Sequence, residues 1–246
     1  MPASAEFLFV ILSGALLTIE LTVLGNLLAV AVAFATGFAR LFRSSWLRLP
    51  ATVFIEFFRG TSMYVQLFWA YFVLPLSGFS LTPFQAAVLI LGLNSGAYAS
   101  EIVRGAMLAL PREQIEACVA LNLGRWQRLR HVLLPQALLL MIPPFSNSAV
   151  ELLKSTSIVS LISLSDMAFR AQTVRAQTGE TAIPYFMILV AYFVLAILIS
   201  TLMRRLERRL ATPNASRERL SRQVRWFSRI SLYWSSTLRG QWASRR

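Results

Sequence analysis

Charged side chains are scarce in this chain of 246 residues, where they make up 14% of the sequence. Ordinary soluble domains carry about 25%. No Lys or Arg occurs in residues 1–39, and no charged residue of either sign occurs in residues 60–100. Water cannot pair with backbone groups inside a bilayer, so long uncharged stretches there must be helices or closed barrels. These runs are too continuously apolar for barrel strands, whose polarity alternates over roughly 10 residues. We therefore expect an all-α integral membrane protein.

Reactive and metal-binding residue types are also scarce. The only cysteine is Cys118 and the only histidine is His131, which excludes an internal disulfide and a histidine-based metal site. The only lysine, Lys154, has no G-x-x-x-x-G-K-[ST] string around it, so the chain has no P-loop for ATP. We expect no metal and no cofactor in this chain. No basic residue precedes the first apolar run, and that run is longer than the apolar core of a signal peptide. A signal peptide is therefore not expected.

The formal net charge of +13 is concentrated at one end of the chain. Residues 204–246 hold 12 arginines against Glu207 and Glu218. A hydrophobic body with a basic end fits a membrane protein with its basic segments in the cytoplasm, and it argues against a nucleic-acid partner. Residues 211–246 are expected to form a disordered basic cytoplasmic tail, the alternative being a tail that lies on anionic lipid.

Five apolar runs are candidates for crossing the bilayer, which takes about 20 residues of helix. They cover residues 12–38, 60–76, 83–103, 132 onward and 183–203. Arginines follow the first, third and fifth runs, namely Arg40, Arg43, Arg48, Arg104, Arg204 and Arg205. Because basic residues favour the cytoplasmic side, the N-terminus is expected outside and the C-terminus inside.

The remaining segments follow from the same pattern. Residues 49–59 are expected to form a helical lead-in at the inner interface, and residues 163–181, which are polar with mixed charge, are expected outside. Pro143 and Pro144 remove two backbone donors from the fourth span. That span should therefore bend or break there.

The segment between the third and fourth spans carries many charges and is expected in the cytoplasm, because such charges are costly in lipid. Pro111 suits a helix start, since its missing donor would be unpaired there. Ile115, Cys118 and Val119 share one face of that helix. Asn122 and Gly124 tolerate left-handed backbone angles and predict a turn before a second short helix near Arg125. The alternative is a surface helix that only shields lipid headgroups.

The order of residues in this segment resembles the coupling loop of binding-protein-dependent permeases. Glu-Ala-Cys at 116–118 is followed after three residues by Asn122, and after nine more by Val-Leu-Leu-Pro at 132–135. The family pattern is E-A-A–x3–G–x9–I-x-L-P. Strings typical of its polar amino-acid uptake group lie in order at residues 56–61, 96–98, 101, 104–105, 134–137, 143–144 and 153–157. The resemblance covers residues 12–206, which are expected to form an ABC transporter type I transmembrane domain.

Three positions depart from the family pattern. Cys118 stands in place of the usual Ala, Asn122 in place of Gly, and Ser62 in place of Pro. Asn is the next most tolerant residue at left-handed angles, so the turn should survive. The Asn and the Phe-Phe-Arg-Gly-Thr-Ser string at 57–62 are similar to the ectoine and hydroxyectoine permeases of the group.

The resemblance implies a multi-pass permease subunit of the bacterial inner membrane that imports a small polar amino-acid-like solute, with ectoine or hydroxyectoine as the narrower expectation. It implies two cytoplasmic ATPase subunits that hold ATP and Mg, a second permease chain that is homologous or identical, and a periplasmic solute-binding protein. Glu116 would be a polar anchor of the loop on the ATPase. The ATPase-coupling residues would be Glu116, Ala117, Cys118, Asn122, Gly124 and Arg125.

Ionisable residues in or near spans are functional candidates. Glu56 with Arg59, and Glu101 with Arg104, are spaced i,i+3 at the predicted inner interface and are expected to be structural ion pairs. Lys154 follows the proline pair, and broken helices usually line cavities. The expected substrate pathway is Lys154, Glu151, Ser155 and Thr156, with Glu151 or Glu20 as a second charge for a zwitterion. Trp69, Tyr71, Phe72 and Tyr98 could form a cation-binding cage, although ordinary span packing is favoured.

Two other classes of protein compete with the permease interpretation. A self-sufficient secondary carrier or channel predicts internal inverted repeats, and no convincing repeat is found. A membrane enzyme would need a catalytic cluster, and one His, one Cys and scattered carboxylates do not supply one. We therefore expect a transport subunit that is not an enzyme.

Overall fold

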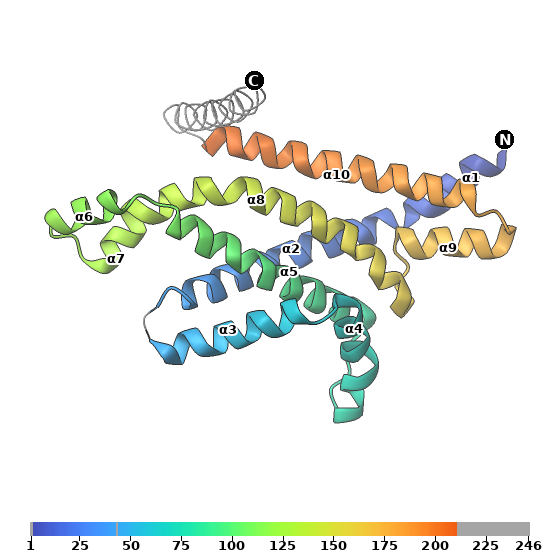
Figure 1. Cartoon of the computed structure of the whole chain (residues 1–246). Coiled ribbons are helices and arrows are strands. Elements are labelled where there is room, and N and C mark those ends of the chain that lie inside the picture. The colour runs from blue at the N-terminus through green and yellow to red at the C-terminus, as the bar shows by residue number, and fades with distance from the viewer. Residues whose placement is uncertain (1, 43, 211–246) are drawn as a thin grey trace, which may run out of the picture. The chain divides into compact units, whose positions relative to one another are not determined.

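The computed structural model describes residues 2–42 and 44–210, and every element within them is helical (Figure 1). Arg43 and the tail at residues 211–246 lie outside the described residues, so the expectations for them stay predictions. The expected all-α membrane fold is confirmed. In the described part, four helical stretches are long and apolar enough to cross a membrane: Phe7–Ala39, Pro83–Leu108, Arg125–Ile162 and Ala182–Arg209.

The elements follow the predicted runs closely. The first run forms α1 (Pro2–Ser13) and α2 (Ala15–Ala39), and the third forms α5 (Pro83–Leu108). The second forms α4 (Met63–Phe68), η1 (Trp69–Val73) and η2 (Leu74–Ser77), a stretch shorter than the other spans. The fourth forms α7 (Arg125–Gln127), η3 (Arg128–Leu133), α8 (Leu134–Ser155) and η4 (Thr156–Ile162), and the fifth forms α10 (Ala182–Leu210).

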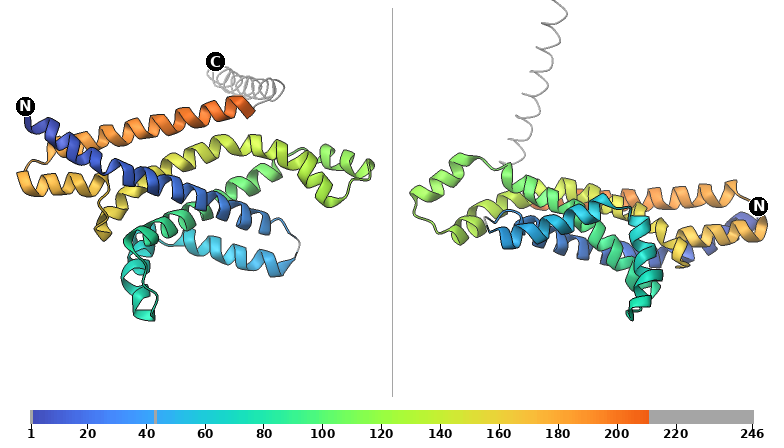
Figure 2. Two further views of the ribbon diagram at one scale, coloured as in Figure 1. Left: turned by 180° about the vertical axis from the view of Figure 1, so that it is seen from behind. Right: turned by 60° about the horizontal axis from the view of Figure 1, so that its bottom comes forward.

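Three helices lie between the spans: α3 (Ser45–Gly60), α6 (Arg112–Ala120) and α9 (Met167–Thr178). The views in Figures 1 and 2 agree that α6 and α7 lie at the opposite end of the spans from α9. The segment expected inside and the segment expected outside are therefore at opposite ends of the helices.

The central contact of the fold is between α2 and α5. Small residues recur every four positions on the buried face of α2: Gly25, Ala29, Ala33 and Gly37. On α5, Gly96 faces α2 so closely that a Cβ there would lie 2.7 Å from Val32 Cβ. Small residues at such spacing let membrane helices approach each other, and dispersion contacts then hold them together.

The fourth span is not broken at its prolines. Helix α8 continues through Pro143 and Pro144 from Leu134 to Ser155, and Figure 1 shows it as one gently curved helix. Proline fixes φ near the helical value, so two prolines remove two donors without ending the helix. The sequence predicted a bend or a break here, and of these two the break is absent while the helix is gently curved.

A break does occur between α3 and α4, where Thr61 and Ser62 are extended. The buried amide of Gln66 donates to Phe58 O at 3.0 Å and to the Thr61 hydroxyl at 2.6 Å. Asn94, on α5, also donates to Phe58 O at 3.0 Å and to Gln66 Oε1 at 3.0 Å. Carbonyls left without helical partners need such donors in a bilayer. These two amides were missed from the sequence.

The loop before α9 holds a buried carboxylate. Asp166 is fully buried and caps α9 by accepting from the Phe169 N–H at 2.8 Å. Tyr192 of α10 donates to its other oxygen at 3.4 Å, and the Met167 N–H donates to the Thr18 hydroxyl of α2 at 3.4 Å. Polar contacts thus tie α2, α9 and α10 together at this end. The sequence predicted only an outer polar segment here.

This carboxylate makes stability depend on pH. Burial raises the pKa of Asp166 from 3.8 to about 6, so the folded chain holds its proton more tightly than the unfolded chain. The free energy of unfolding should therefore fall as the pH rises from about 4 to about 6, by about 3 kcal/mol, and stay lower above that. Asp166→Asn should keep the cap and remove this slope. Unfolding midpoints in detergent at about pH 4.5 and about pH 7.5 measure it, and an unchanged slope in the variant would contradict it.

Candidate functional site

The loop between α5 and α8 folds as a helix–turn–helix. Pro111 precedes α6, and α6 ends where Asn122 has a left-handed backbone with φ of 54°. The Asn122 N–H donates to Val119 O at 2.9 Å, and the Leu123 N–H donates to Cys118 O at 3.0 Å. This pair of bonds is the Schellman motif, which requires a left-handed residue at the position after the helix. Asn122 therefore makes the turn that the family pattern assigns to glycine.

The second half of the loop begins at Gly124, whose backbone is extended rather than left-handed. Its N–H donates to Gln127 Oε1 at 2.9 Å, and its carbonyl accepts from the Arg128 N–H at 2.9 Å. The turn therefore depends on one left-handed residue, and Gly124 serves as the N-terminal cap of the following helix.

The outer surface of this loop, defined here as Glu116, Ala117, Val119, Leu121 and Trp126, is exposed. Leu121 is 74% exposed and Trp126 is 68% exposed. Cys118 differs from its predicted neighbours on the helix face, because it is buried. The face predicted for Ile115, Cys118 and Val119 is thus divided, with Cys118 inside and Val119 outside. The result is a small apolar surface beside the exposed carboxylate of Glu116.

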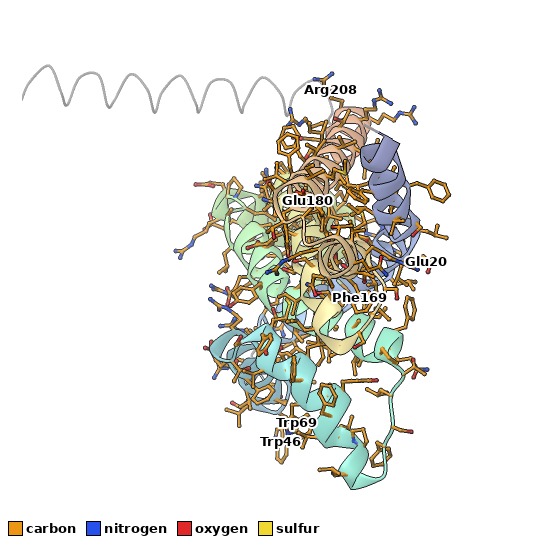
Figure 3. The ribbon with its side chains drawn as sticks, turned by 90° about the vertical axis from the view of Figure 1, so that its right-hand side faces the viewer. Glu20, Trp46, Trp69, Phe169, Glu180 and Arg208 are labelled. Carbon is orange, nitrogen blue, oxygen red and sulfur yellow. The ribbon has the colours of Figure 1, made fainter. Side chains whose placement is uncertain are left out.

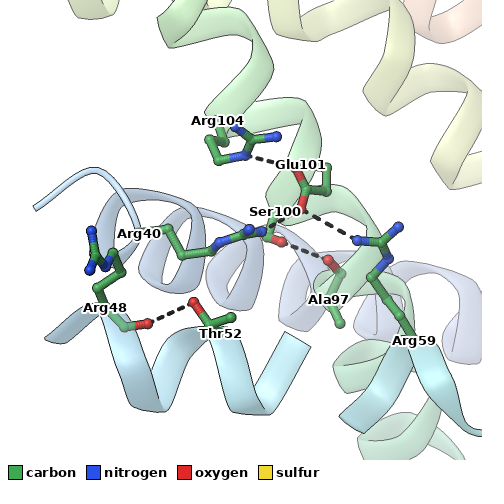
Figure 4. Close-up of polar contacts among 8 residues, drawn as sticks. All are labelled: Arg40, Arg48, Thr52, Arg59, Ala97, Ser100, Glu101 and Arg104. Carbon is green, nitrogen blue, oxygen red and sulfur yellow. Dashed lines mark hydrogen bonds and ion pairs between the residues drawn. The ribbon is translucent and has the colours of Figure 1, made fainter. Parts of the chain in front are cut away.

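The predicted ion pairs are rearranged around one carboxylate (Figure 4). Glu101 accepts from Arg104 Nε at 2.8 Å, as the i,i+3 spacing predicts. Arg59 pairs with Glu101 at 3.4 Å and not with Glu56, which is exposed and has no ion pair among the described residues. The reason is geometric, since α3 lies against α5 and brings Arg59 to Glu101. Arg40 at the end of α2 also pairs with Glu101, and it was not predicted.

The aromatic cage considered as an alternative to span packing does not form around Tyr98. The guanidinium of Arg59 lies over the Tyr98 ring, 5.5 Å from its centroid, and the Tyr98 hydroxyl donates to Arg59 O at 3.3 Å. Trp69 and Phe72 are about half exposed on the η1 turn, and Figure 3 shows Trp69 among the exposed side chains. Tyr98 thus already has a cation over its ring.

The four residues predicted for the substrate pathway have different environments at the end of α8. Lys154 is exposed and borders an open groove of about 740 Å³ between α8 and α10, which is also lined by Ser157, Tyr192, Phe193, Ala196 and Ser200. Glu151 is exposed, and its carbonyl accepts from the Ser155 hydroxyl at 3.0 Å. Thr156 is buried and donates to Leu153 O at 2.7 Å. Glu20 is exposed on α2 (Figure 3). Only Lys154 of the four pathway residues lines the groove.

Comparison with known sequences gives a family match over most of the chain. Residues 25–212 match the family described as "Binding-protein-dependent transport system inner membrane component". The chain is 42% identical over 200 residues to the probable amino-acid ABC transporter permease protein y4tF of Sinorhizobium fredii, covering 79% of this chain and 84% of that protein. It is 36% identical over 202 residues to the glutamine transport system permease protein GlnP of Escherichia coli, covering 81% and 92%. It is equally identical over 202 residues to the L-cystine transport system permease protein TcyB of Bacillus subtilis, covering 81% and 86%.

Solved structures show the same fold. The crystal structure of an amino acid ABC transporter with histidines matches with a TM-score of 0.79 and 30% identity, over 84% of this chain and 97% of that chain. An inward-facing structure of the MetNI methionine ABC transporter matches with a TM-score of 0.70 and 20% identity, which supports the fold alone.

Proposed function

The chain belongs to the family of inner membrane components of binding-protein-dependent transport systems, and from this premise we propose that it is the permease subunit of an ATP-driven amino-acid importer. Its partners would be two cytoplasmic ATPase subunits, a second permease chain and a periplasmic solute-binding protein. ATP and Mg would be held by the ATPases. ATP-driven closure of the ATPases would then move the spans between inward-open and outward-open states.

The observation that carries this proposal is the exposed helix–turn–helix between α5 and α8. Its outer surface combines apolar side chains such as Leu121 with the carboxylate of Glu116, and exposed apolar patches of this kind mark contacts with other proteins. The loop is flanked by two long spans, α5 and α8. A movement of the loop caused by the ATPase would therefore move these spans directly. We assign six residues of the loop to this ATPase contact: Glu116, Ala117, Asn122, Gly124, Arg125 and Cys118. Cys118 is buried and would pack beneath the contact surface, and Asn122 and Gly124 form the turn and the helix cap.

Reconstitution tests this assignment. The chain would be placed in liposomes alone, then with its ATPase, and then with its ATPase and binding protein. The proposal predicts uptake only for the complete set with ATP. Uphill uptake by this chain alone would contradict it and favour the rival interpretation, a secondary carrier.

The side on which the loop lies can be labelled directly. Cys118 is 4% exposed and would react poorly, whereas Val119 is 56% exposed. We expect the double variant Cys118→Ala, Val119→Cys to resist a membrane-impermeant maleimide in intact cells and to react after the inner membrane is opened. A cysteine at Glu180, which lies beyond the end of α9, is the matched control and should react in spheroplasts. The reverse pattern would place the loop outside.

The substrate we propose is a small polar amino acid. The names of two relatives above specify glutamine and cystine, and neither specifies ectoine. Ectoine therefore stays the narrower prediction, based on Asn122 and the string at residues 57–62 alone. Titration of the partner binding protein with glutamine, cystine and ectoine tests this prediction. Tight binding of ectoine alone would support ectoine as the substrate, and tight binding of glutamine or cystine would contradict it.

Lys154 is the residue we propose for the substrate pathway. Lys154 lines the α8–α10 groove, and its ammonium group has three N–H donors that suit a carboxylate. Lys154→Met should lower uptake by about tenfold or more, because a charge-assisted hydrogen bond is lost. Arg175→Gln, which removes an exposed charge on α9 outside the groove lining, is the control. Unchanged uptake kinetics in Lys154→Met would remove Lys154 from the pathway.

A further inference from the structure

The cluster formed by Arg40, Arg59, Glu101 and Arg104 carries more positive charge than its one carboxylate can neutralise. Three guanidinium groups from α2, α3 and α5 converge on Glu101, which leaves two positive charges without an acidic partner in the cluster. Each guanidinium has five N–H donors, so most donors remain unused after the bonds to Glu101. Surplus charge near a membrane span is costly unless water or an anion meets it.

The cluster lies on an exposed strip of an otherwise buried helix. Most of α5 is buried from Ala86 to Ala106, but Tyr98 is 51% exposed, and the partly exposed Glu101 and the exposed Gly105 continue its strip toward the end of the helix. Residues at i, i+3 and i+7 share one helix face. This face of a central helix is therefore open along its charged part.

Helix α3 carries Arg59 and an apolar face on different sides. Trp46, Val53 and Phe57 are exposed on one side of α3 and line an apolar groove. With about 100° between successive residues, Arg59 lies on nearly the opposite side of the helix from Trp46 and Phe57. Arg59 thus points away from the face of α3 that suits lipid tails.

From this arrangement we propose that the cluster binds the α-carboxylate of the transported amino acid on its way through the spans. The inference rests on the proposed import function and deepens it by naming a second anion site besides Lys154. Arg59 would be the principal ligand, since its guanidinium lies over the Tyr98 ring and its side chain is 36% exposed, the carboxylate of Glu101 being 3.4 Å away. A fixed guanidinium fork matches a carboxylate in a bidentate way. The carboxylate of Glu101 would then compete with the substrate carboxylate for the guanidinium of Arg59, and the substrate would displace it in part.

This assignment makes two variants behave in opposite directions. Arg59→Gln removes a ligand, so carboxylate binding should weaken by about tenfold or more. Glu101→Gln removes the competing negative charge and should tighten binding of an added carboxylate. A purely structural ion-pair cluster predicts no such opposition, since both changes would only loosen the protein. Arg48→Gln, on the same helix as Arg59 but with no contact to Glu101, is the matched control.

The experiment uses the complete transporter purified in detergent. Shifts of the unfolding midpoint would be titrated with each common amino acid and ectoine, then with the α-amide of the best stabiliser and with inorganic phosphate. We expect a carboxylate-specific shift that weakens in Arg59→Gln, is kept in part in Arg59→Lys, and strengthens in Glu101→Gln. No shift by any amino acid, an equal shift by the α-amide, a stronger shift by phosphate, or the same change in both variants would overturn the inference.

Uptake by the same preparations in liposomes separates the two claims. If ATP-driven uptake occurs in the wild type but the binding shifts do not follow the opposed pattern, the anion site is refuted and the import function stands. If no ATP-driven uptake occurs with the complete set of partners, the import function itself fails.

Discussion

Replacing Ala117 by tryptophan is expected to lower ATP-driven uptake by tenfold or more while leaving membrane insertion intact. Ala117 is exposed on α6 beside Glu116, so the larger ring has room in the isolated chain. It would occupy the space that the ATPase needs, and overpacked contacts typically cost about 1–3 kcal/mol. Glu116→Ala, which removes the proposed polar anchor, should have a smaller effect in the same direction. Uptake in liposomes and ATP hydrolysis stimulated by the binding protein would be measured together.

The matched control for this variant is Arg112→Trp. It adds the same ring to the same short helix, about 140° around the axis from Ala117, and Arg112 is also exposed. The control should transport nearly normally. Normal uptake by both Ala117→Trp and Glu116→Ala would remove the loop from the coupling mechanism, whatever the result for Arg112→Trp.

Replacing Gly96 is expected to have the largest effect on folding. A Cβ at residue 96 would lie 2.7 Å from Val32 Cβ and 3.0 Å from Ala29 O, and neither atom is at the end of a flexible side chain. Helices α2 and α5 would have to move apart. Gly96→Ala should cost about 1–3 kcal/mol, and Gly96→Leu should prevent folding. Thermal unfolding in detergent and the yield of monodisperse protein measure these effects.

Gly105, on the same helix, gives a control in which the change in stability should be zero or favourable. A Cβ there meets nothing within 4 Å, and the backbone is helical. Gly105→Ala should be neutral or stabilise the protein by up to about 1 kcal/mol, because alanine favours a helix more than glycine does. Equal stability of Gly96→Ala and Gly105→Ala would contradict the packing described for α2 and α5.

Hydrophobic patterning predicted the helices well because a bilayer leaves the backbone few choices. The runs at residues 83–103 and 183–203 became α5 and α10, each extended by a few residues. The turn at Asn122 was also predicted, since few residues accept left-handed angles. A bend or a break was predicted at Pro143 and Pro144, and α8 continues through them without a break, because the φ of proline is compatible with a helix.

Tertiary partners could not be predicted from spacing alone. Arg59 lies i,i+3 from Glu56, yet it pairs with Glu101, whose position depends on how α3 packs against α5. Asp166 lies in the segment that was predicted only as polar and outside, although it is buried as the cap of α9. Polar residues inside apolar runs, such as Gln66 and Asn94, were the available signal for the break between α3 and α4.

The turn at Asn122 has a consequence for how such loops are recognised in other genomes. Its two hydrogen bonds come from the backbone N–H groups of Asn122 and Leu123 and require a positive φ at residue 122, which glycine and asparagine adopt most readily. A search string that insists on glycine would discard this chain, although Asn122 forms the left-handed turn. The turn in this chain is defined by a torsion angle, and a search that accepts either glycine or asparagine at this position would retain it.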